Sequence, residues 1–253
     1  MSAALIVLKP RQVKPAEDAL AELPDWLTVV EIVGYSEREL ADGIFRSTLD
    51  AFPHDVFLVA SDDVIIRKHA VEAVLRLVAD GVCASGYCQL THTDWRVNAT
   101  RAPLKGILPT EDAYDFLRFD EVISGPPVRR SWFTGMSLTT MTAEMWARFP
   151  FGCFTSGPDC KGYASDFHLS RRLAEAGIPI VLARDAFCYH WRHVRENTND
   201  PRDDKLLVGA VKPEIRRFER SRPVGSHDMD GCETVRAETP GTPPFTPTGR
   251  VFP

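Results

Sequence analysis

The sequence predicts an α/β fold with a mostly parallel sheet flanked by helices, because strand and helix signals alternate along its first half. Residues 56–60 (VFLVA) form a continuous apolar run between polar residues, which is typical of a central parallel strand buried on both faces. Residues 71–78 then repeat valine and leucine at helical spacing, and Gly81 stands where a helix C-terminus favours glycine. Together these features indicate strand–helix–strand units.

The segment before residue 56 continues the same alternation. Strands are expected over residues 3–8 and 27–33, and helices over residues 16–23 and 36–51. Lys9 and Pro10 end the first apolar run, and the second run is rich in β-branched residues. Ser36 and Glu39 have the spacing of a capping box, which predicts that the longer helix begins there.

The second half is less regular. Residues 91–130 are polar with scattered aromatic residues, and we expect short strands or an insertion there. A regular pattern returns with a helix expected over residues 164–176, closed by Gly177, and a strand over residues 178–183.

The composition changes near the C-terminus. Residues 222–253 contain six prolines and four glycines in 32 positions. That share is near the ~25–30% at which chains become low in complexity. We therefore predict a folded domain over residues 1–221 and a Pro/Gly-rich C-terminal tail over residues 222–253.

Charge and hydropathy argue against several classes of protein. The net charge of -5 and the pI of about 5.8 disfavour a dedicated nucleic-acid binder, which usually presents a strongly basic face. No apolar run approaches the ~18 residues that span a bilayer, and the N-terminal segment lacks the features of a secretion signal. The six cysteines include no C-x-x-C pair, so we expect reduced, mostly buried thiols and a cytoplasmic location.

Asp62 and Asp63 directly follow the expected central strand. This position lies at the carboxyl end of a parallel strand, where open α/β sheets bind their ligands. Adjacent carboxylates repel each other unless they are solvated or bridged by a cation, so Mg²⁺ or Mn²⁺ bound to a diphosphate would suit them. The alternative is a solvated loop in which one of the two carboxylates caps the next helix.

Two side chains in the second half are further candidates for chemistry. Asp166 opens an expected helix, where it serves either as a general base or as a partner for the free N–H groups of the first turn. His190 follows the last expected strand, where a lone histidine is more often a hydrogen-bonded core residue than a metal ligand. His190 and His193 have a spacing compatible with zinc ligands on a helix, but no third ligand is near in sequence.

Residues 132–138 (WFTGMSL) place two aromatic residues beside Gly135. This composition suits a wall that lets a sugar ring approach the backbone, although aromatic residues more often belong to a core. The sequence has no P-loop motif, no G-x-G-x-x-G and no G-x-S-x-G, so the motifs of P-loop NTPases, dinucleotide-binding enzymes and α/β-hydrolases are all missing.

Taken in order, these segments resemble the GT-A glycosyltransferases, and among them the large inverting family 2 group. The matching segments are the D-x-D-like strand end at residues 56–63, the glycine-containing segment 132–146, the acidic helix start at Asp166 with Arg172 and Gly177, and the closing strand and histidine at residues 178–190. The resemblance covers about residues 27–193 and implies a GT-A, Rossmann-like fold.

The resemblance also implies roles for single residues. Asp63 would bind the metal that bridges the donor diphosphate, with Asp62 assisting, and His190 would complete the metal sphere. Asp166 would deprotonate the acceptor hydroxyl as general base. The other residues expected to bind the donor are Lys9 on the N-terminal turn, Arg46 on the helix before the acidic pair, and Gly135.

The implied activity is that of a metal-dependent glycosyltransferase, which moves a sugar from a nucleotide sugar, expected to be a UDP-sugar, to an acceptor hydroxyl with inversion. Mn²⁺ or Mg²⁺ is the expected cofactor, and the acceptor stays open among a polysaccharide, a protein and a modified nucleic acid. Ser61, Ser165 and Gly34 stand where the family usually has acidic residues. Two alternatives therefore stay open: a sugar nucleotidyltransferase of similar fold, and a degenerate module that binds carbohydrate or a partner without catalysis.

Overall fold

The computed structural model describes residues 1–90, 95–105, 113–152, 165–191, 204–206 and 211–220. Among these residues, no helix is long and apolar enough to cross a membrane. The chain divides into two units, Met1–Arg220 and Ser221–Pro253, and all described residues belong to the first. The expected tail over residues 222–253 therefore stays a prediction.

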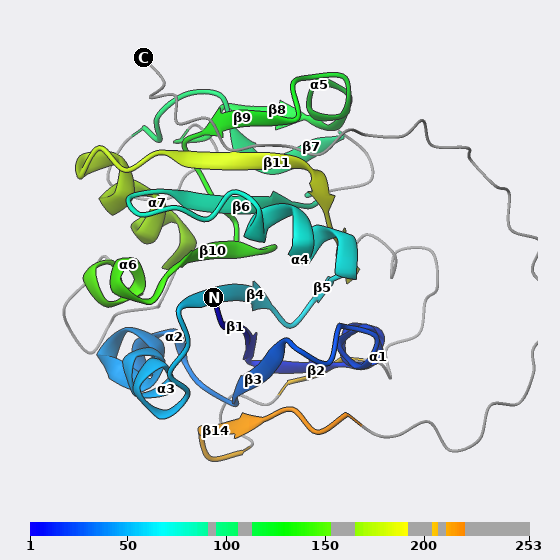
Figure 1. The fold of residues 1–253 in the computed structure, drawn as a ribbon, viewed down its shortest axis with the longest axis vertical. Helices are drawn as coiled ribbons and strands as arrows, with labels where there is room; N and C mark the ends of the chain where they lie inside the picture. Colours follow the sequence, from blue (N-terminus) through cyan, green and yellow to red (C-terminus); the bar gives the residue numbers. More distant parts are fainter. Residues whose placement is uncertain (91–94, 106–112, 153–164, 192–203, 207–210, 221–253) are drawn as a thin grey trace, which may run out of the picture. The chain divides into compact units, whose positions relative to one another are not determined.

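An eight-stranded sheet forms the centre of the first unit (Figure 1). Its strands, in spatial order, are β14 (Glu214–Arg217), β3 (Thr28–Val33), β1 (Ala3–Lys9), β4 (Val56–Ser61), β10 (Thr139–Thr142), β6 (Cys83–Tyr87), β11 (Ile180–Phe187) and β9 (Val128–Ser131). Strands β3, β1, β4, β6 and β11 run in one direction, whereas β14, β10 and β9 run against them. The sheet is thus mostly parallel, which confirms the expected α/β, Rossmann-like fold class.

Two apolar cores flank the sheet, because successive side chains of a strand point to opposite faces. Helices α1 (Lys14–Ala21) and α4 (Lys68–Leu75) cover one face, and α3 (Phe45–Ala51), α6 (Ala143–Arg148) and α7 (Ser165–Glu175) cover the other (Figure 1). In β1, Leu5 and Val7 belong to the first core, whereas Ala4, Ile6 and Leu8 belong to the second. This explains why the strand is apolar throughout.

The helix expected over residues 36–51 is interrupted. Ser36 and Glu39 make the predicted capping interaction, since the Glu39 N–H donates to Ser36 Oγ and the Ser36 N–H donates to the Glu39 carboxylate. However, the segment is divided into α2 (Glu37–Glu39), a π-helical turn η1 (Leu40–Ile44) and α3. Gly43 causes the break, because its φ of 133° lies outside the helical range.

Gly81 does not close a helix as expected. Helix α4 already ends at Leu75, and Gly81 adopts a φ of 74° in the turn before β6. By contrast, the helix expected over residues 164–176 is confirmed as α7. Gly177 follows it with a φ of 71°, and its N–H donates to the Ala174 carbonyl oxygen, as is typical of a glycine beyond a helix end.

The described part of residues 91–130 contains short elements, as expected. These are β7 (Arg96–Thr100), β8 (Phe116–Arg118), α5 (Phe119–Ile123) and the start of β9. Strands β7 and β8 pair with each other outside the central sheet. Their buried side chains Val97, Ala99 and Leu117 pack with Tyr87 and Leu182, which places this small layer beside β6 and β11.

Two short strand pairs shape the loops at one edge of the sheet. β5 (Val64–Ile65) pairs with β12 (Tyr189–His190), and β2 (Arg11–Val13) pairs with β13 (Asp204–Leu206). Strands β2, β5 and β12 directly follow the parallel strands β1, β4 and β11. The pairs therefore lie just beyond the carboxyl ends of these parallel strands.

Candidate functional site

The expected site residues follow strands that end at the same edge of the sheet. Strands β1, β4 and β11 lead into Arg11, the Asp62-Asp63 pair and His190 respectively. Strand β10 runs in the opposite direction and begins at this edge, which brings Gly135 there as well. Helix α7 leads into the start of β11, so its own first turn, with Asp166, lies toward the edge where β11 ends.

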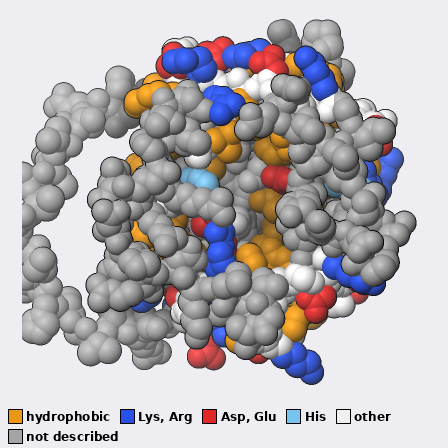
Figure 2. Space-filling model, turned by 180° about the vertical axis from the view of Figure 1, so that it is seen from behind, with side chains coloured by type: hydrophobic (Ala, Val, Ile, Leu, Met, Phe, Trp, Pro, Cys, Tyr) orange, Lys and Arg blue, Asp and Glu red, His pale blue; other side chains and the backbone are white. Residues whose placement is uncertain are grey.

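A cavity of about 340 Å³ opens at this edge. Its volume lies within the ~300–1,000 Å³ typical of small-molecule sites. Asp63, Gly135, Asp166 and His190 all line it, so the fold brings four of the seven expected site residues together. Figure 2 shows a hollow at which hydrophobic, acidic and histidine side chains gather.

The Arg11 side chain bridges the two adjacent carboxylates. Asp62 and Asp63 are 2% and 6% exposed. Arg11 Nη2 lies 2.8 Å from Asp62 Oδ1 and 2.8 Å from Asp63 Oδ2, and the Arg11 backbone N–H donates to Asp62 Oδ2 over 2.7 Å. Neither carboxylate caps the next helix, because Arg67 occupies the N-cap of α4. The alternative of a solvated, capping loop is therefore wrong.

The pairing of β5 with β12 brings His190 to Asp63. The Trp191 N–H donates to the Asp63 carbonyl oxygen over 2.7 Å, and His190 Nε2 lies 3.3 Å from Asp63 Oδ2. His190 Nδ1 is buried and has no hydrogen-bond partner within the described part of the chain. His190 therefore contacts a carboxylate at the cavity and does not sit in a wholly apolar core.

Burial and charge set the ionisation of the two carboxyl groups differently. Burial raises the pKa of Asp62 to about 6, although the hydrogen bonds and charge of Arg11 partly offset this. Burial also opposes ionisation of Asp63, but the hydrogen bond and charge of His190, together with Arg11, outweigh it and hold the pKa of Asp63 below its ordinary value. Asp63 therefore stays ionised over a wider pH range than Asp62.

The side chains around Asp63 fit part of the coordination sphere of a divalent cation. A carboxylate and an imidazole both bind divalent transition metals. A separation of 3.3 Å lets one ion contact both atoms at ligand distances of about 2.1 Å. Among the residues that the structure describes, no group of three or more His, Cys, Asp or Glu side chains could hold a metal. Substrate phosphate and water would supply the remaining ligands, as is common for Mg²⁺.

Asp166 and three aromatic residues form another side of the cavity. Asp166 Oδ1 accepts a 2.8 Å hydrogen bond from the Phe167 N–H at the start of α7. Tyr114, Phe116 and Phe133 line the cavity, and the rings of Tyr114 and Phe116 stack with centroids 4.7 Å apart. Burial, with the nearby charge of Asp166, raises the pKa of Tyr114 above its ordinary value, so Tyr114 is a neutral phenol.

Gly135 permits a close approach to Asn98 at the cavity wall. A Cβ at position 135 would lie 2.6 Å from Asn98 Nδ2 and 2.8 Å from Asn98 Cβ. Asn98 is held in place because its Oδ1 accepts from the Cys88 N–H over 2.8 Å and its Nδ2 donates to Ser137 Oγ over 2.6 Å. Packing therefore requires a glycine here, whether or not a sugar approaches it.

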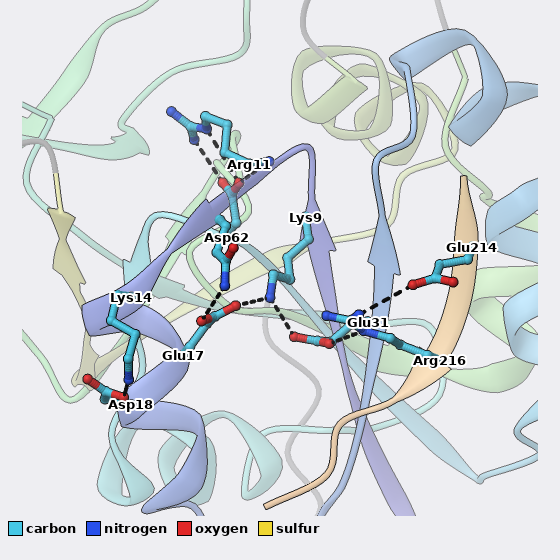
Figure 3. A network of polar contacts seen from close by, with 10 residues as sticks. Lys9, Arg11, Lys14, Glu17, Asp18, Glu31, Asp62, Glu214 and Arg216 are labelled. Atoms are coloured by element: carbon cyan, nitrogen blue, oxygen red, sulfur yellow. Dashed lines mark hydrogen bonds and ion pairs between the residues drawn. The ribbon is translucent and has the colours of Figure 1, made fainter. Parts of the chain in front are cut away.

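Lys9 belongs to a separate, buried network of charges (Figure 3). Its ammonium group is 3% exposed and forms ion pairs with Glu17 and, over 2.9 Å, with Glu31 Oε1. Arg216 on β14 binds the other carboxylate oxygen of Glu31 over 2.7 Å. The expected role of Lys9 in donor binding stays a prediction, and its partners here are protein carboxylates.

Arg46 and Asp62 also lie outside the set of residues that line the cavity. Arg46 is exposed on α3, where its Nη2 donates to the Ala147 carbonyl oxygen over 3.1 Å. Asp62 faces Arg11, with its side chain only 1% exposed. Their expected contacts with a donor are not tested by this geometry.

The sequence did not single out Arg11, Asn98 and Tyr114. The one available signal for Arg11 is its place just after the first strand, because β1 and β4 are neighbours and end at the same edge. Asn98 and Tyr114 lie in the irregular segment 91–130, which carries no motif. Backbone bonds between β7 and residues 88–90, together with the pairing of β7 with β8, bring that segment to the site.

The cysteines that the structure describes are buried, as expected. Cys83, Cys88 and Cys188 are free thiols. Burial raises the pKa of Cys83 and of Cys88 to about 12, which makes both unreactive. The other three cysteines and His193 lie outside the described residues.

No protein-family model and no curated protein matches the chain. Among solved structures, it is similar to the mannosyltransferase PcManGT from Pyrobaculum calidifontis, in complex with GDP-Man and Mn²⁺, with a TM-score of 0.47 and 16% identity over 75% of this chain. It is also similar to the inositol-1-phosphate CTP transferase from T. maritima, with a TM-score of 0.40 and 9% identity over 80% of this chain and 91% of that one. The chain spans 56% of the length of the mannosyltransferase. Both are named as transferases, and at these identities the similarity concerns the fold alone.

Proposed function

We propose that the chain is a metal-dependent glycosyltransferase of the inverting type, which transfers a sugar from a nucleotide sugar, expected to be a UDP-sugar, to an acceptor hydroxyl. One observation carries the proposal. Asp63, His190 and Asp166, to which the family resemblance assigns the metal and the base, lie far apart in sequence yet line a single cavity.

Asp63 and His190 are the residues proposed to hold Mn²⁺ or Mg²⁺. Their ligand atoms are 3.3 Å apart, and both side chains line the cavity. The bound cation would neutralise the charge that grows on the leaving diphosphate. Asp63 directly precedes β5, which pairs with β12, and the Trp191 N–H donates to the Asp63 carbonyl oxygen, so backbone hydrogen bonds hold Asp63 beside His190.

Asp166 is proposed as the general base that takes the proton of the acceptor hydroxyl. It shares the cavity with Asp63 and with an aromatic wall of Tyr114, Phe116 and Phe133. Aromatic faces suit the apolar faces of sugar rings and exclude water from the reacting carbon. A single displacement with one base then inverts the anomeric centre.

A sugar nucleotidyltransferase is the second candidate, and Arg11 is the observation that favours it. Such enzymes bind a nucleoside triphosphate with a basic N-terminal loop, and Arg11 lies on the turn after β1 directly over the acidic pair. The turn Lys9-Pro10-Arg11 lacks the glycines usual in those loops. A non-catalytic binding module is the third candidate, since Ser61 and Ser165 replace acidic residues of the resembled family.

Calorimetry and turnover assays with matched substrates separate these three functions. The protein is incubated with a panel of UDP- and GDP-sugars, and separately with nucleoside triphosphates plus sugar phosphates, each with Mn²⁺ or with EDTA. We expect Mn²⁺-dependent binding and slow hydrolysis of one nucleotide sugar. Formation of pyrophosphate only from a triphosphate and a sugar phosphate would identify a nucleotidyltransferase, and binding without turnover a binding module.

The Asp63→Asn variant tests the metal site within the same assay. Asparagine keeps the size of the side chain but removes the charge of the proposed ligand. Donor affinity in Mn²⁺ should fall by at least roughly 10–100-fold, which is the usual loss even when only a hydrogen-bond partner of a metal ligand is changed. Asp185→Asn is the matched control, because Asp185 is exposed on β11 and pairs only with Arg184 among the described residues. Equal donor binding in EDTA and in Mn²⁺ would contradict the metal-dependent mechanism.

A further inference from the structure

Arg11 contacts the same carboxylate oxygen of Asp63 that a cation held by Asp63 and His190 would use. Its Nη2 contacts Asp63 Oδ2 over 2.8 Å, and the same oxygen lies 3.3 Å from His190 Nε2. A metal held by Asp63 and His190 would therefore share this carboxylate with a guanidinium. Two cations at one oxygen repel each other, so the arrangement in the structure favours one or the other.

The two carboxylates hold Arg11 in different ways. Asp62 binds its backbone N–H over 2.7 Å and its Nη2 over 2.8 Å, and the Asp62 side chain is 1% exposed and lines no part of the cavity. Asp63 accepts a hydrogen bond from the Nη2 of Arg11, lies 3.3 Å from His190 Nε2 and lines the cavity. The bond to Asp63 is thus the one that a ligand in the cavity can replace, while Asp62 keeps the turn in place (Figure 3 shows Arg11 over Asp62).

We propose that Arg11 is an exchangeable counter-ion. Without a divalent cation, the guanidinium neutralises Asp63. When a cation binds at Asp63 and His190, the guanidinium leaves Asp63, stays anchored by Asp62, and binds a phosphate oxygen of the nucleoside diphosphate. This inference rests on the proposed function and adds a mechanism by which metal and diphosphate bind cooperatively.

The exchange predicts that removal of Arg11 changes the affinity for a metal and the affinity for a diphosphate in opposite directions. A guanidinium suits a phosphate because its planar set of donors matches two oxygens at once. Removing Arg11 should strengthen the binding of a metal, because a competing positive charge is lost, yet weaken the binding of a diphosphate. An arginine that serves only as a phosphate ligand would leave metal affinity unchanged, and one that stays on Asp63 for structure alone would leave diphosphate affinity unchanged. The two opposite changes together therefore identify the exchange.

The test measures Mn²⁺ affinity of the full chain without nucleotide, from the free-Mn²⁺ electron paramagnetic resonance signal, in wild type and Arg11→Gln. We expect Arg11→Gln to bind Mn²⁺ at least about tenfold more tightly, since a unit charge a few ångströms away is worth several kcal/mol at low effective dielectric. Calorimetry with UDP and with GDP at saturating Mn²⁺ should show at least about tenfold weaker binding in the same variant. Arg101→Gln is the matched control, because Arg101 also bridges two carboxylates, Asp115 and Glu121, at an exposed site.

Unchanged or weaker Mn²⁺ binding in folded Arg11→Gln overturns the exchange and leaves the proposed function standing. Absence of Mn²⁺ binding in both proteins, with UDP or GDP present as well as without nucleotide, overturns the proposed function and the exchange together. If Arg11→Gln does not fold, as judged by circular dichroism, Arg11→Lys replaces it. A lysine keeps the charge but cannot bridge both carboxylates with a planar fork, so Mn²⁺ binding should tighten by a few fold, and no change would overturn the exchange.

Discussion

Two clusters of buried charge lie side by side at the end of β1 and differ in one respect. In the Lys9 cluster, Lys9 binds Glu17 and Glu31, and Arg216 binds the remaining oxygen of Glu31. In the Arg11 cluster, Arg11 binds Asp62 and Asp63. Both clusters contain buried ion pairs, but among the described residues only the Arg11 cluster has a carboxylate that lines the cavity.

The difference shows that burial of charge alone does not mark a functional site. A buried ion pair is costly to break and yet contributes little net stability over an apolar replacement of both partners. The Lys9 cluster joins β1, α1, β3 and the late strand β14, so its effect is to hold four distant segments together. The Arg11 cluster includes Asp63, which lines the cavity, so a ligand there can reach its charge.

The largest expected effect comes from breaking the Lys9 cluster. Lys9→Met keeps most of the apolar stem of the side chain. It removes the ion-pair partner of Glu17 and the partner of one carboxylate oxygen of Glu31. Unfolding free energy should fall by about 3–5 kcal/mol, the usual cost of removing one partner from a buried pair. Chemical denaturation followed by circular dichroism measures it.

Lys14→Met is the control for this change, because Lys14 pairs with Asp18 on the exposed surface of α1. Its unfolding free energy should stay within about 0.5 kcal/mol of wild type. Nucleotide binding by folded Lys9→Met tests the donor contact that the family resemblance implies for Lys9. If Lys9→Met and Lys14→Met lower the unfolding free energy equally, the Lys9 cluster contributes no more to stability than an exposed ion pair does.

The sequence predicted the acidic pair well and its surroundings poorly. A strand that is apolar on both faces is typical of a central parallel strand, so the position of Asp62 and Asp63 at its carboxyl end follows from the local pattern alone. The approach of Arg11 and His190 depends on which strands pair, and strand pairing is non-local. The different orientations of Asp62 and Asp63 depend on the β5–β12 pair, which is two residues long and leaves no periodic signal.

The helices and strands also divide into those that the local sequence predicts and those that it does not. The long, periodic helix α7 and the apolar strands were predictable from spacing and propensity. The break at Gly43 was not, because a capping box at Ser36 reports only where a helix begins. The antiparallel strand β10, inserted between β4 and β6, reads like any short strand, and only the register of its pairing reveals its direction.

The next largest effect is expected from a substitution of Asp166 in the cavity, which should lower turnover and leave the fold intact. In Asp166→Asn, the amide oxygen still accepts the Phe167 N–H but cannot take a proton from an acceptor. Turnover should fall by about 10²–10⁴-fold, the usual contribution of a general base, while the melting temperature stays unchanged. Steady-state kinetics and thermal denaturation on the same preparation measure both. Wild-type turnover in this variant would mean that Asp166 serves only as a helix-start partner.

A smaller effect is expected at Gly135, which lines the cavity and packs tightly against Asn98. Gly135→Ala introduces a Cβ 2.6 Å from Asn98 Nδ2, and Asn98 is held by two hydrogen bonds. Unfolding free energy should fall by about 1–3 kcal/mol, the range for overpacking a tight site. Asn98→Ala in the same background removes the clash, so the two changes should couple in a double-mutant cycle of unfolding free energies. Additive losses would show that position 135 has room for a methyl group.

The smallest effect is expected at the C-terminus, where two truncations distinguish a structural strand from the tail. Removal of residues 222–253 should change the unfolding free energy by less than about 0.5 kcal/mol, because a segment so rich in proline and glycine cannot build regular elements.

Removal from residue 212 onward also takes β14, and with it the Arg216 contact to Glu31 and the bonds of Arg220 to the carbonyl oxygens of Pro24 and Leu27. That longer truncation should destabilise the domain markedly, because Glu31 loses a partner in the Lys9 cluster and β3 becomes an open edge. Differential scanning calorimetry compares the two. A large loss from the shorter truncation would show that the tail packs on the domain, contrary to the prediction from its composition.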